Sequence, residues 1–278
     1  MRRLITAVIL FSSCILGFIA KGQSNTISCK YRCHYLYQFA SSEQDVTRPE
    51  GLRFKRVVLD IGEKHSLFYF RTGYLAQLYV DSLKSCGVHW QTAMDKAILR
   101  YGYKGETLAE RIYKNFPQKG TLRCITSKMK TFYYDEKMEK PQWKLHSETK
   151  QIEGYNCQKA TASFKGREWT AWYTSELPFS DGPWKLWGLP GLILEAQDSK
   201  GYFHFTFRGI EPIDAKEDPI TLVRPLWIKA TKEYVKELQT LEKKDMNEMI
   251  KRVIGVYAYD ENGKKMANPQ YTPVNIEE

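Results

Sequence analysis

Residues Ser28–Phe39 read Ser-Cys-Lys-Tyr-Arg-Cys-His-Tyr-Leu-Tyr-Gln-Phe and set a pattern that most of the chain repeats. Every second residue from Cys29 to Phe39 is a cysteine or an aromatic residue, while most residues between them are polar. Successive side chains of a β-strand point to opposite faces. The segment is therefore predicted to be a strand with one aromatic, buried face and one mostly polar face.

Similar alternation predicts eight further strands, at residues 52–61, 66–71, 122–129, 131–135, 143–152, 155–164, 168–174 and 202–210. Turn-prone residues 62–65 make the first two of these strands a candidate hairpin. Gly154, Gly166 and Gly201 lie at the turns that join later strands. Consecutive strands joined by short turns pair antiparallel. The sequence thus predicts a mainly β (α+β) protein with an antiparallel meander.

A few helices are expected beside the sheet, because apolar residues recur at three- and four-residue spacing in 74–83, 107–116 and 231–252. Pro117 would end the second helix, and Thr231 would cap the third, C-terminal one. We expect a single β-rich domain over residues 23–260, followed by a loose tail over 261–278. A separate helix-capped subdomain around 74–117 is the alternative.

The start of the chain has the three parts of a secretory signal peptide. Arg2 and Arg3 precede a 17-residue apolar run, Leu4–Ala20, and Ala20-Lys21-Gly22 offers small residues at a cleavage site. A membrane anchor needs about 20 apolar residues, and lipid attachment at Cys14 is disfavoured because the apolar run continues past it. We expect residues 1–22 to be removed, which places the mature chain in the periplasm, in the cell envelope or outside the cell.

Cleavage would leave 256 of 278 residues and lower the net charge from +10 to +7. Lysines and glutamates are intermixed along the chain, whereas nucleic-acid-binding proteins gather their basic residues. No nucleic-acid partner is therefore expected. No later stretch has the apolar length of a membrane span, so no transmembrane segment is expected in the mature chain.

Five cysteines remain after cleavage, namely Cys29, Cys33, Cys86, Cys124 and Cys157. Some would pair in an oxidising envelope, or all would be small core residues. The spacing Cys29-x-x-x-Cys33-His34 has one residue too many for haem attachment. On a strand both cysteines would share a face and His34 would point away, so we expect no metal site and no cofactor.

Ser175–Leu194 reads Ser-Glu-Leu-Pro-Phe-Ser-Asp-Gly-Pro-Trp-Lys-Leu-Trp-Gly-Leu-Pro-Gly-Leu-Ile-Leu. Three prolines interrupt regular pairing, and three glycines permit backbone angles that other residues resist. The segment is predicted to be a shaped loop, pinned by Trp184 and Trp187, that leads into a strand at residues 192–194.

The hexapeptide Gly188–Ile193, Gly-Leu-Pro-Gly-Leu-Ile, resembles the name-giving motif of the GLPGLI family of exported proteins from Gram-negative bacteria. The resemblance extends upstream to Ile152-x-Gly-Tyr-x-Cys-x-Lys-Ala160, Gly166-Arg-x-Trp-x-Ala-Trp-Tyr-Thr174 and Gly182-Pro-Trp-Lys185. With the signal peptide and the Tyr-rich strand, it covers essentially the whole chain.

This resemblance implies a fold more than a function, since the family is largely uncharacterised and has no established catalytic residues. A related domain is similar to the bowl-shaped N-terminal module of some peptide-N-glycosidases, which implies a curved antiparallel sheet, bowl-like or an open barrel, around a cavity. Family genes often lie near outer-membrane transport or receptor proteins, which are possible partners by association.

The loop offers a candidate groove for a ligand or partner. Glycines let a ligand approach the backbone and tryptophans offer stacking surface; the residues chosen on this basis are Trp172, Trp184, Trp187, Gly188, Pro190 and Gly191. The competing interpretation is a turn that closes the core, because apolar residues dominate the hexapeptide. On its strand, Trp172 is predicted to face away from Trp169 and Tyr173.

No residue is assigned a catalytic role. The five histidines form no known catalytic motif. Four carboxylates flank the hexapeptide, namely Glu176, Asp181, Glu195 and Asp198. Glycosidase chemistry needs two carboxylates at a defined distance from each other, and the sequence does not give that distance. We expect a non-catalytic binding or accessory protein for an apolar, peptide or glycan ligand. An envelope hydrolase acting on peptide or glycan is the alternative.

Overall fold

The computed structural model of the chain describes residues 26–102, 110–128, 130–214, 220–221, 227–255 and 276–277. The expected signal peptide at residues 1–22 lies outside these ranges, as does the expected tail apart from Ile276 and Glu277. Among the residues that the structure describes, no helix has the length and apolar character that crossing a membrane requires.

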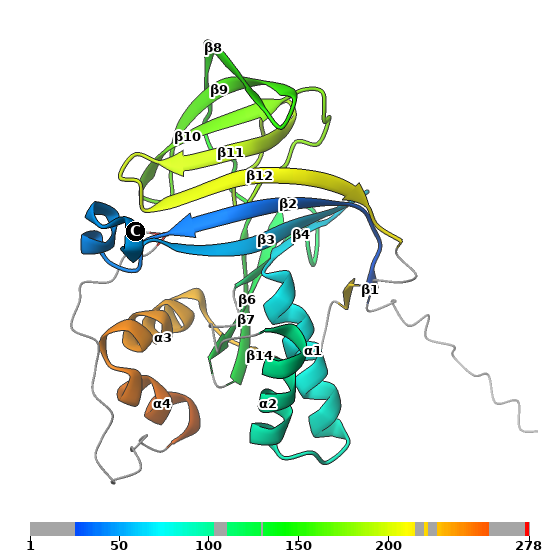
Figure 1. Cartoon of the computed structure of the whole chain (residues 1–278), viewed down its shortest axis with the longest axis vertical. Helices are drawn as coiled ribbons and strands as arrows, with labels where there is room; N and C mark the ends of the chain where they lie inside the picture. Colours follow the sequence, from blue (N-terminus) through cyan, green and yellow to red (C-terminus); the bar gives the residue numbers. More distant parts are fainter. Residues whose placement is uncertain are drawn as a thin grey trace, which may run out of the picture.

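Twelve strands form one open, curved sheet (Figure 1). Its first half is a meander of β2 (Cys29–Phe39), β3 (Arg53–Gly62), β4 (Ser66–Tyr69), β5 (Arg111–Lys114), β6 (Thr121–Lys128) and β7 (Lys130–Lys137). Its second half is a meander of β8 (Lys144–Ile152), β9 (Tyr155–Phe164), β10 (Arg167–Thr174), β11 (Leu192–Asp198) and β12 (Phe203–Pro212).

Antiparallel pairing of β12 with β2 joins the two meanders. At the far edge, β14 (Trp227–Lys229) pairs parallel with β7, so the sheet is mixed, and it does not close into a barrel. A separate two-stranded sheet consists of β1 (Thr26–Ile27) and β13 (Ile220–Thr221). The predicted mainly β class with a curved sheet is confirmed.

Helices α1 (Arg71–Ser85) and α2 (Trp90–Tyr101) form a hairpin between β4 and β5 and project from the sheet (Figure 1). Short 3-10 turns at Glu43–Thr47 and Pro49–Gly51 link β2 to β3. The hairpin has a small core of its own around Ala76, Ala93 and Ala97, which are at most 2% exposed. α1 was predicted from its periodicity; α2, which ends at Gly102 in the left-handed conformation, was not.

The helix predicted over 107–116 is wrong for residues 111–114, which form strand β5 between β4 and β6. The spacing of Leu108, Ile112 and Phe116 suited a helix. All four residues of β5 are buried, including Arg111 and Lys114. Tertiary packing on both faces thus overrides a local period that only three residues supported.

The helix predicted over 231–252 is two helices, α3 (Lys232–Lys244) and α4 (Met246–Ile254). Thr231 caps α3 as predicted, because its hydroxyl accepts a hydrogen bond from the Tyr234 amide. Asp245 breaks the helix with a non-helical backbone (φ −147°, ψ 84°), and its carboxylate caps α4 at the Glu248 amide. A short acidic side chain competes well for such a cap.

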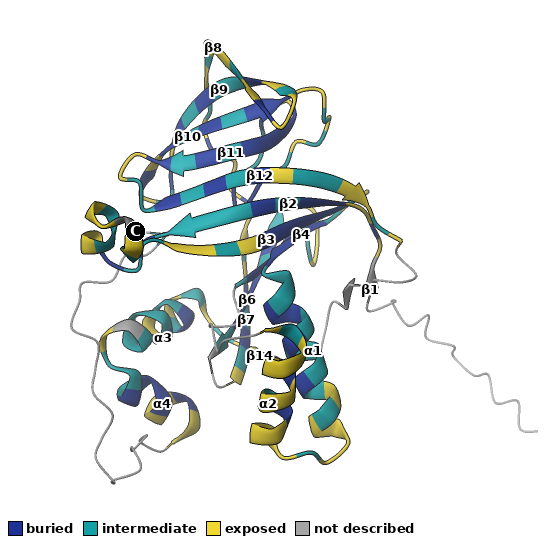
Figure 2. Ribbon diagram, in the orientation of Figure 1, coloured by how far each residue is buried: buried dark blue, intermediate teal, exposed yellow. Residues whose placement is uncertain are grey.

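Different segments pack on the two faces of the sheet, and the burial of its residues is coloured in Figure 2. The face that carries Tyr35, Trp169 and Phe205, here the inner face, forms the main core with segment 175–191, α3 and α4. On the opposite, outer face, Val58 and Tyr69 pack with Tyr74 of α1. Along β2, β12, β11 and β10 the outer residues are mostly half-exposed.

Cys29 and Cys33 do not share a face, contrary to the prediction. The β2–β3 register shifts between Cys29 and Tyr31, so Cys29 packs in the cluster under α1 while Cys33 lies in the main core. No disulfide joins the five described cysteines, and only Cys86 is exposed. Burial raises the pKa of the Cys124 thiol to about 12. These four buried thiols are therefore core residues.

A buried ion pair on the outer face gives a test of the fold. Arg32 donates to both carboxylate oxygens of Asp60 at 2.8 and 2.7 Å, and the Tyr69 hydroxyl donates to the same carboxylate at 2.9 Å. Asp60→Asn should lower the free energy of unfolding by about 3–5 kcal/mol, because it removes the negative charge that binds the buried guanidinium through both carboxylate oxygens. Urea denaturation measures this.

The matched control is Arg123–Asp135, which has the same two-bond geometry at 2.7 and 2.8 Å but is more exposed. Asp135→Asn should cost less than about 1 kcal/mol. Equal losses in the two variants would contradict the role of burial.

Candidate functional site

The segment 175–191 connects β10 to β11, and its residues 182–186, Leu189 and Gly191 are buried. Trp184 is 2% exposed and its ring lies 5.6 Å from that of Trp169 and 6.0 Å from that of Phe164. Leu186 and Leu189 are also buried. The middle of the loop is thus a structural plug on the inner face of the sheet.

Two glycines allow this plug to pack closely. A side chain at Gly191, where φ is +151°, would place its Cβ 1.9 Å from the Thr174 carbonyl oxygen. At Gly182 a Cβ would lie 2.8 Å from that of Ile193. Gly191, predicted as a ligand contact, is itself buried and serves close backbone packing.

A buried lysine fixes the first part of the loop. Lys114 of β5 donates from Nζ to Asp181 Oδ1 at 2.5 Å and to the carbonyl oxygens of Gly182 and Leu186 at 2.6 and 3.1 Å. Ser66 Oγ donates to the other oxygen of Asp181 at 2.5 Å. Burial lowers the pKa of Lys114, and Asp181 partly offsets that effect.

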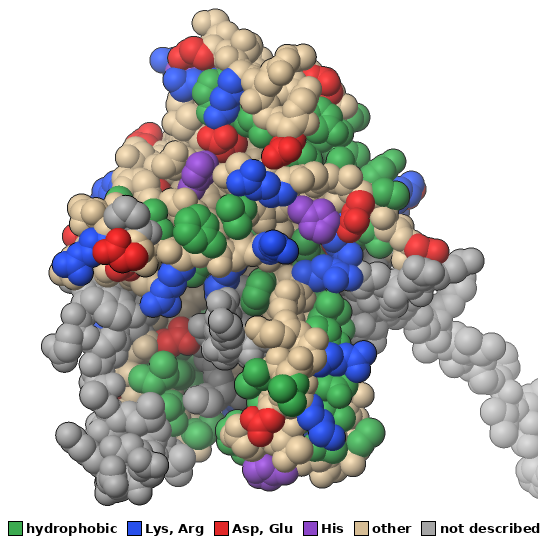
Figure 3. All heavy atoms as spheres, in the orientation of Figure 1, with side chains coloured by type: hydrophobic (Ala, Val, Ile, Leu, Met, Phe, Trp, Pro, Cys, Tyr) green, Lys and Arg blue, Asp and Glu red, His purple; other side chains and the backbone are tan. Residues whose placement is uncertain are grey.

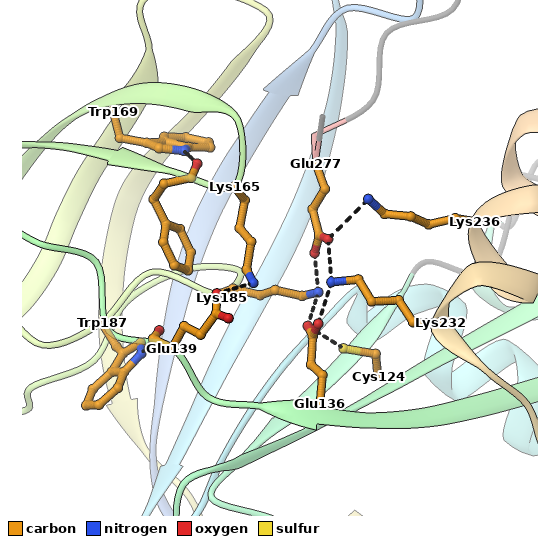
Figure 4. Close-up of polar contacts among 11 residues, drawn as sticks. Cys124, Glu136, Glu139, Lys165, Trp169, Lys185, Trp187, Lys232, Lys236 and Glu277 are labelled. Carbon is orange, nitrogen blue, oxygen red and sulfur yellow. Dashed lines mark hydrogen bonds and ion pairs between the residues drawn. The ribbon is translucent and has the colours of Figure 1, made fainter.

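A second buried lysine, Lys185, belongs to a group of charged residues here called the Lys185 cluster, namely Glu136, Lys185, Lys232, Lys236 and Glu277 (Figure 4). Lys185 is fully buried and donates to Glu136 at 2.5 Å and to Glu277. Lys232 of α3 binds the same two carboxylates at 2.5 and 3.0 Å. The cluster joins the loop to β7, α3 and the 276–277 segment.

The carboxylates of the cluster are held in their charged form. Burial raises the pKa of Glu277, but Lys185 and Lys232 outweigh it and lower the pKa to about 2. The same balance of burial against Lys185 and Lys232 lowers the pKa of Glu136. Opposite charges at hydrogen-bond distance thus offset the cost of desolvation.

Trp187, Gly188 and Pro190 of the loop reach solvent beside Trp143, which directly precedes β8, and these four residues are here called the tryptophan rim. Trp187 Nε1 donates to the Glu139 carbonyl oxygen at 2.9 Å, and Trp143 Nε1 donates to the Trp187 carbonyl oxygen at 2.8 Å. Both rings are half-exposed. Their orientation is fixed by backbone hydrogen bonds, which leaves the rings available for apolar contact.

The structure separates the six predicted binding residues. Trp184 and Gly191 are buried, whereas Trp187, Gly188 and Pro190 lie at the rim. Trp172 lies on the outer face, as predicted, with Lys150 Nζ 4.4 Å above its ring.

The four flanking carboxylates each have separate partners. Glu176 accepts from the Asn156 amide at 2.8 Å, and Asp198 pairs with Arg167 at 3.0 Å. Glu195 binds Lys150 at 2.8 Å on the outer face, whereas Asp181 binds Lys114 and Ser66 on the inner face. These four residues therefore do not form the paired acids that glycosidase chemistry uses.

Sequence reasoning missed Lys114, Lys185 and their carboxylate partners. A signal was present, because each lysine directly follows or precedes a bulky apolar residue, in Ile112-Tyr113-Lys114 and Trp184-Lys185-Leu186. A lysine inside an apolar run of a shaped loop indicates a buried ammonium that needs an acid from elsewhere. The tertiary fold decides which acidic residue pairs with this ammonium group.

Comparisons with known proteins support the fold and leave the function open. Residues 163–195 match a family model described as "Protein of unknown function (Porph_ging)". Two solved structures of PNGF-II, in space groups P21 and C2, each align with a TM-score of 0.50 and 15% identity over 78% of this chain and 34% of theirs. The chain thus spans about a third of the PNGF-II chain. No curated protein matches the chain.

Gly191→Ala should be among the most damaging single substitutions in the loop. The new Cβ would overlap the Thr174 carbonyl oxygen, so strand β10 or the loop must move. We expect a loss of more than about 3 kcal/mol in the free energy of unfolding, measured by urea denaturation. Gly154→Ala is the control: its φ is +84° with open space around it, and about 1–2 kcal/mol is expected. Similar losses would contradict close packing at Gly191.

The Lys185 cluster predicts a pH dependence of stability. The pKa of Glu277 falls from 4.5 to about 2 on folding, so its contribution is present above about pH 5 and is lost as the pH falls toward 2. Between pH 6 and pH 2, wild type should lose up to about 3 kcal/mol more than Glu277→Gln. Denaturation curves at several pH values measure the difference; parallel pH profiles would refute it.

Proposed function

We propose that the chain is an exported, non-catalytic binding or accessory protein of the GLPGLI family that holds its ligand or partner at the tryptophan rim. The observation that carries the proposal is the pair of half-exposed indoles, Trp187 of the loop and Trp143 directly before β8, whose Nε1 atoms both donate to backbone carbonyl oxygens. Rigid aromatic anchors lose little conformational freedom on binding. The rim suits apolar, peptide or glycan ligands that present a flat apolar surface.

Export is supported by the charged, apolar and small-residue parts of segment 1–22. It places the protein in the periplasm, in the envelope or outside the cell, where an outer-membrane transport or receptor protein is the proposed partner.

The hydrolase alternative receives less support from the geometry. The carboxylates near the loop are each engaged by separate amide or cationic partners. On the outer face, His204 Nε2 is the atom near both Thr206 Oγ1 and Glu195 Oε1, each at 3.4 Å. A relay needs both ring nitrogens, so this arrangement does not reproduce a nucleophile–base–acid triad.

Native purification from the envelope, with mass spectrometry of the intact chain and of whatever accompanies it, tests the proposal. The mature chain should begin at Gln23, and Trp187→Ala should lose at least tenfold of the co-purified ligand or partner while retaining its far-UV circular dichroism. The control is Trp172→Ala on the outer face, which should retain it. A ligand-free, partner-free wild-type monomer, or equal loss in both variants, would count against a binding rim.

A further inference from the structure

The segment Ile276–Glu277 docks on three separate parts of the protein. The Ile276 side chain packs against the main core, and its carbonyl oxygen accepts from Arg167 Nε at 3.2 Å. The Glu277 carboxylate contacts Lys185 of the loop and Lys232 and Lys236 of α3, the last two at 3.0 and 3.8 Å. One dipeptide therefore binds through an apolar side chain, a backbone carbonyl and a charge.

The site that receives Glu277 is cationic without it. Besides Glu277, Lys185 and Lys232 share the carboxylate of Glu136 (Figure 4), and the negative charge of Glu110 also acts on Lys185. Lys185 is fully buried, and a buried ammonium is costly unless carboxylates or carbonyls surround it. Lys185, Lys232 and Lys236 outnumber Glu136 and Glu110, so the site has positive charge for a further carboxylate, and we call its three lysines the carboxylate socket.

The socket is closed at one end and open at the other. The side chains of Lys185, Lys232 and Lys236 are 0%, 24% and 44% exposed, and that of Glu277 is 10% exposed. Solvent therefore reaches the socket along α3, and a carboxylate can enter and leave by that side. Lys232 is the first residue of the 13-residue helix α3, whose N-terminal end also favours an anion.

We propose that the carboxylate socket, with Arg167 and the adjoining core, is a reversible docking site for an acidic peptide in which an apolar residue precedes a glutamate. Ile276–Glu277 is its resident ligand. When this segment is released, the socket accepts an equivalent segment from another chain. The socket shares no residue with the tryptophan rim, so either proposal can fail without the other.

The test uses the full chain with Ile276→Ala and Glu277→Gln, which removes both anchors of the resident segment. The probe is a fluorescent synthetic peptide of residues 270–278, titrated with protein while its anisotropy is followed. The doubly substituted chain should bind the peptide at least tenfold more tightly than wild type, whose socket is occupied. Binding should fall at least tenfold when the peptide carries Glu277→Gln, and it should weaken from 50 to 500 mM salt.

Lys232→Ala, added to the doubly substituted chain, should also weaken binding, while Lys229→Ala on the exposed end of β14 should not. Equal binding by wild type and the doubly substituted chain, or indifference to Glu277→Gln in the peptide, would overturn the proposal. So would an undetectable complex at 1 mM peptide with a folded receptor. Global unfolding of both the double variant and Glu277→Gln alone would also overturn it, because a reversible ligand does not maintain the fold.

Discussion

The buried ammonium group of Lys114 determines where the loop between β10 and β11 packs on the inner face of the sheet. It has no access to solvent, so its three donors need acceptors within the protein. Asp181, Gly182 and Leu186 supply them, and all three lie in the loop between β10 and β11. The loop must therefore lie against β5, on the opposite half of the sheet from the strands that it connects.

This constraint explains the unusual composition of the loop. A segment pressed onto a sheet needs glycine where backbones meet, as at Gly191 beside Thr174, and large apolar residues to fill the space between strands. Trp184 fills that space with a backbone φ of +53°, which is rare for a bulky residue. The hexapeptide is therefore primarily a packing element, and only its tip is available to a ligand.

Charge organises the other side of the loop. Lys185 shares Glu136 and Glu277 with Lys232, so strand β7, helix α3, the loop and the 276–277 segment meet at one cluster. Among the described residues on the face in Figure 3, acidic and basic side chains are intermixed. The similarity to PNGF-II agrees with this architecture, and the tryptophan rim and carboxylate socket are features of this chain's own residues.

The sequence alone determined most of the strands and their faces, because side-chain alternation is a local property that burial on one side imposes. It correctly placed Trp172 opposite Trp169 and Tyr173, capped α3 at Thr231 and led the loop into β11.

Tertiary structure decided the rest. Residues 111–114 became a strand because both neighbours were strands, and a bulge turned Cys29 away from Cys33. Asp181 lies 67 residues from Lys114 in the sequence, and Glu277 lies 92 residues from Lys185. No local sequence pattern encodes pairs at such separations. Only the folded chain brings such charges together, since burial of an ammonium selects whichever acid the packing places beside it.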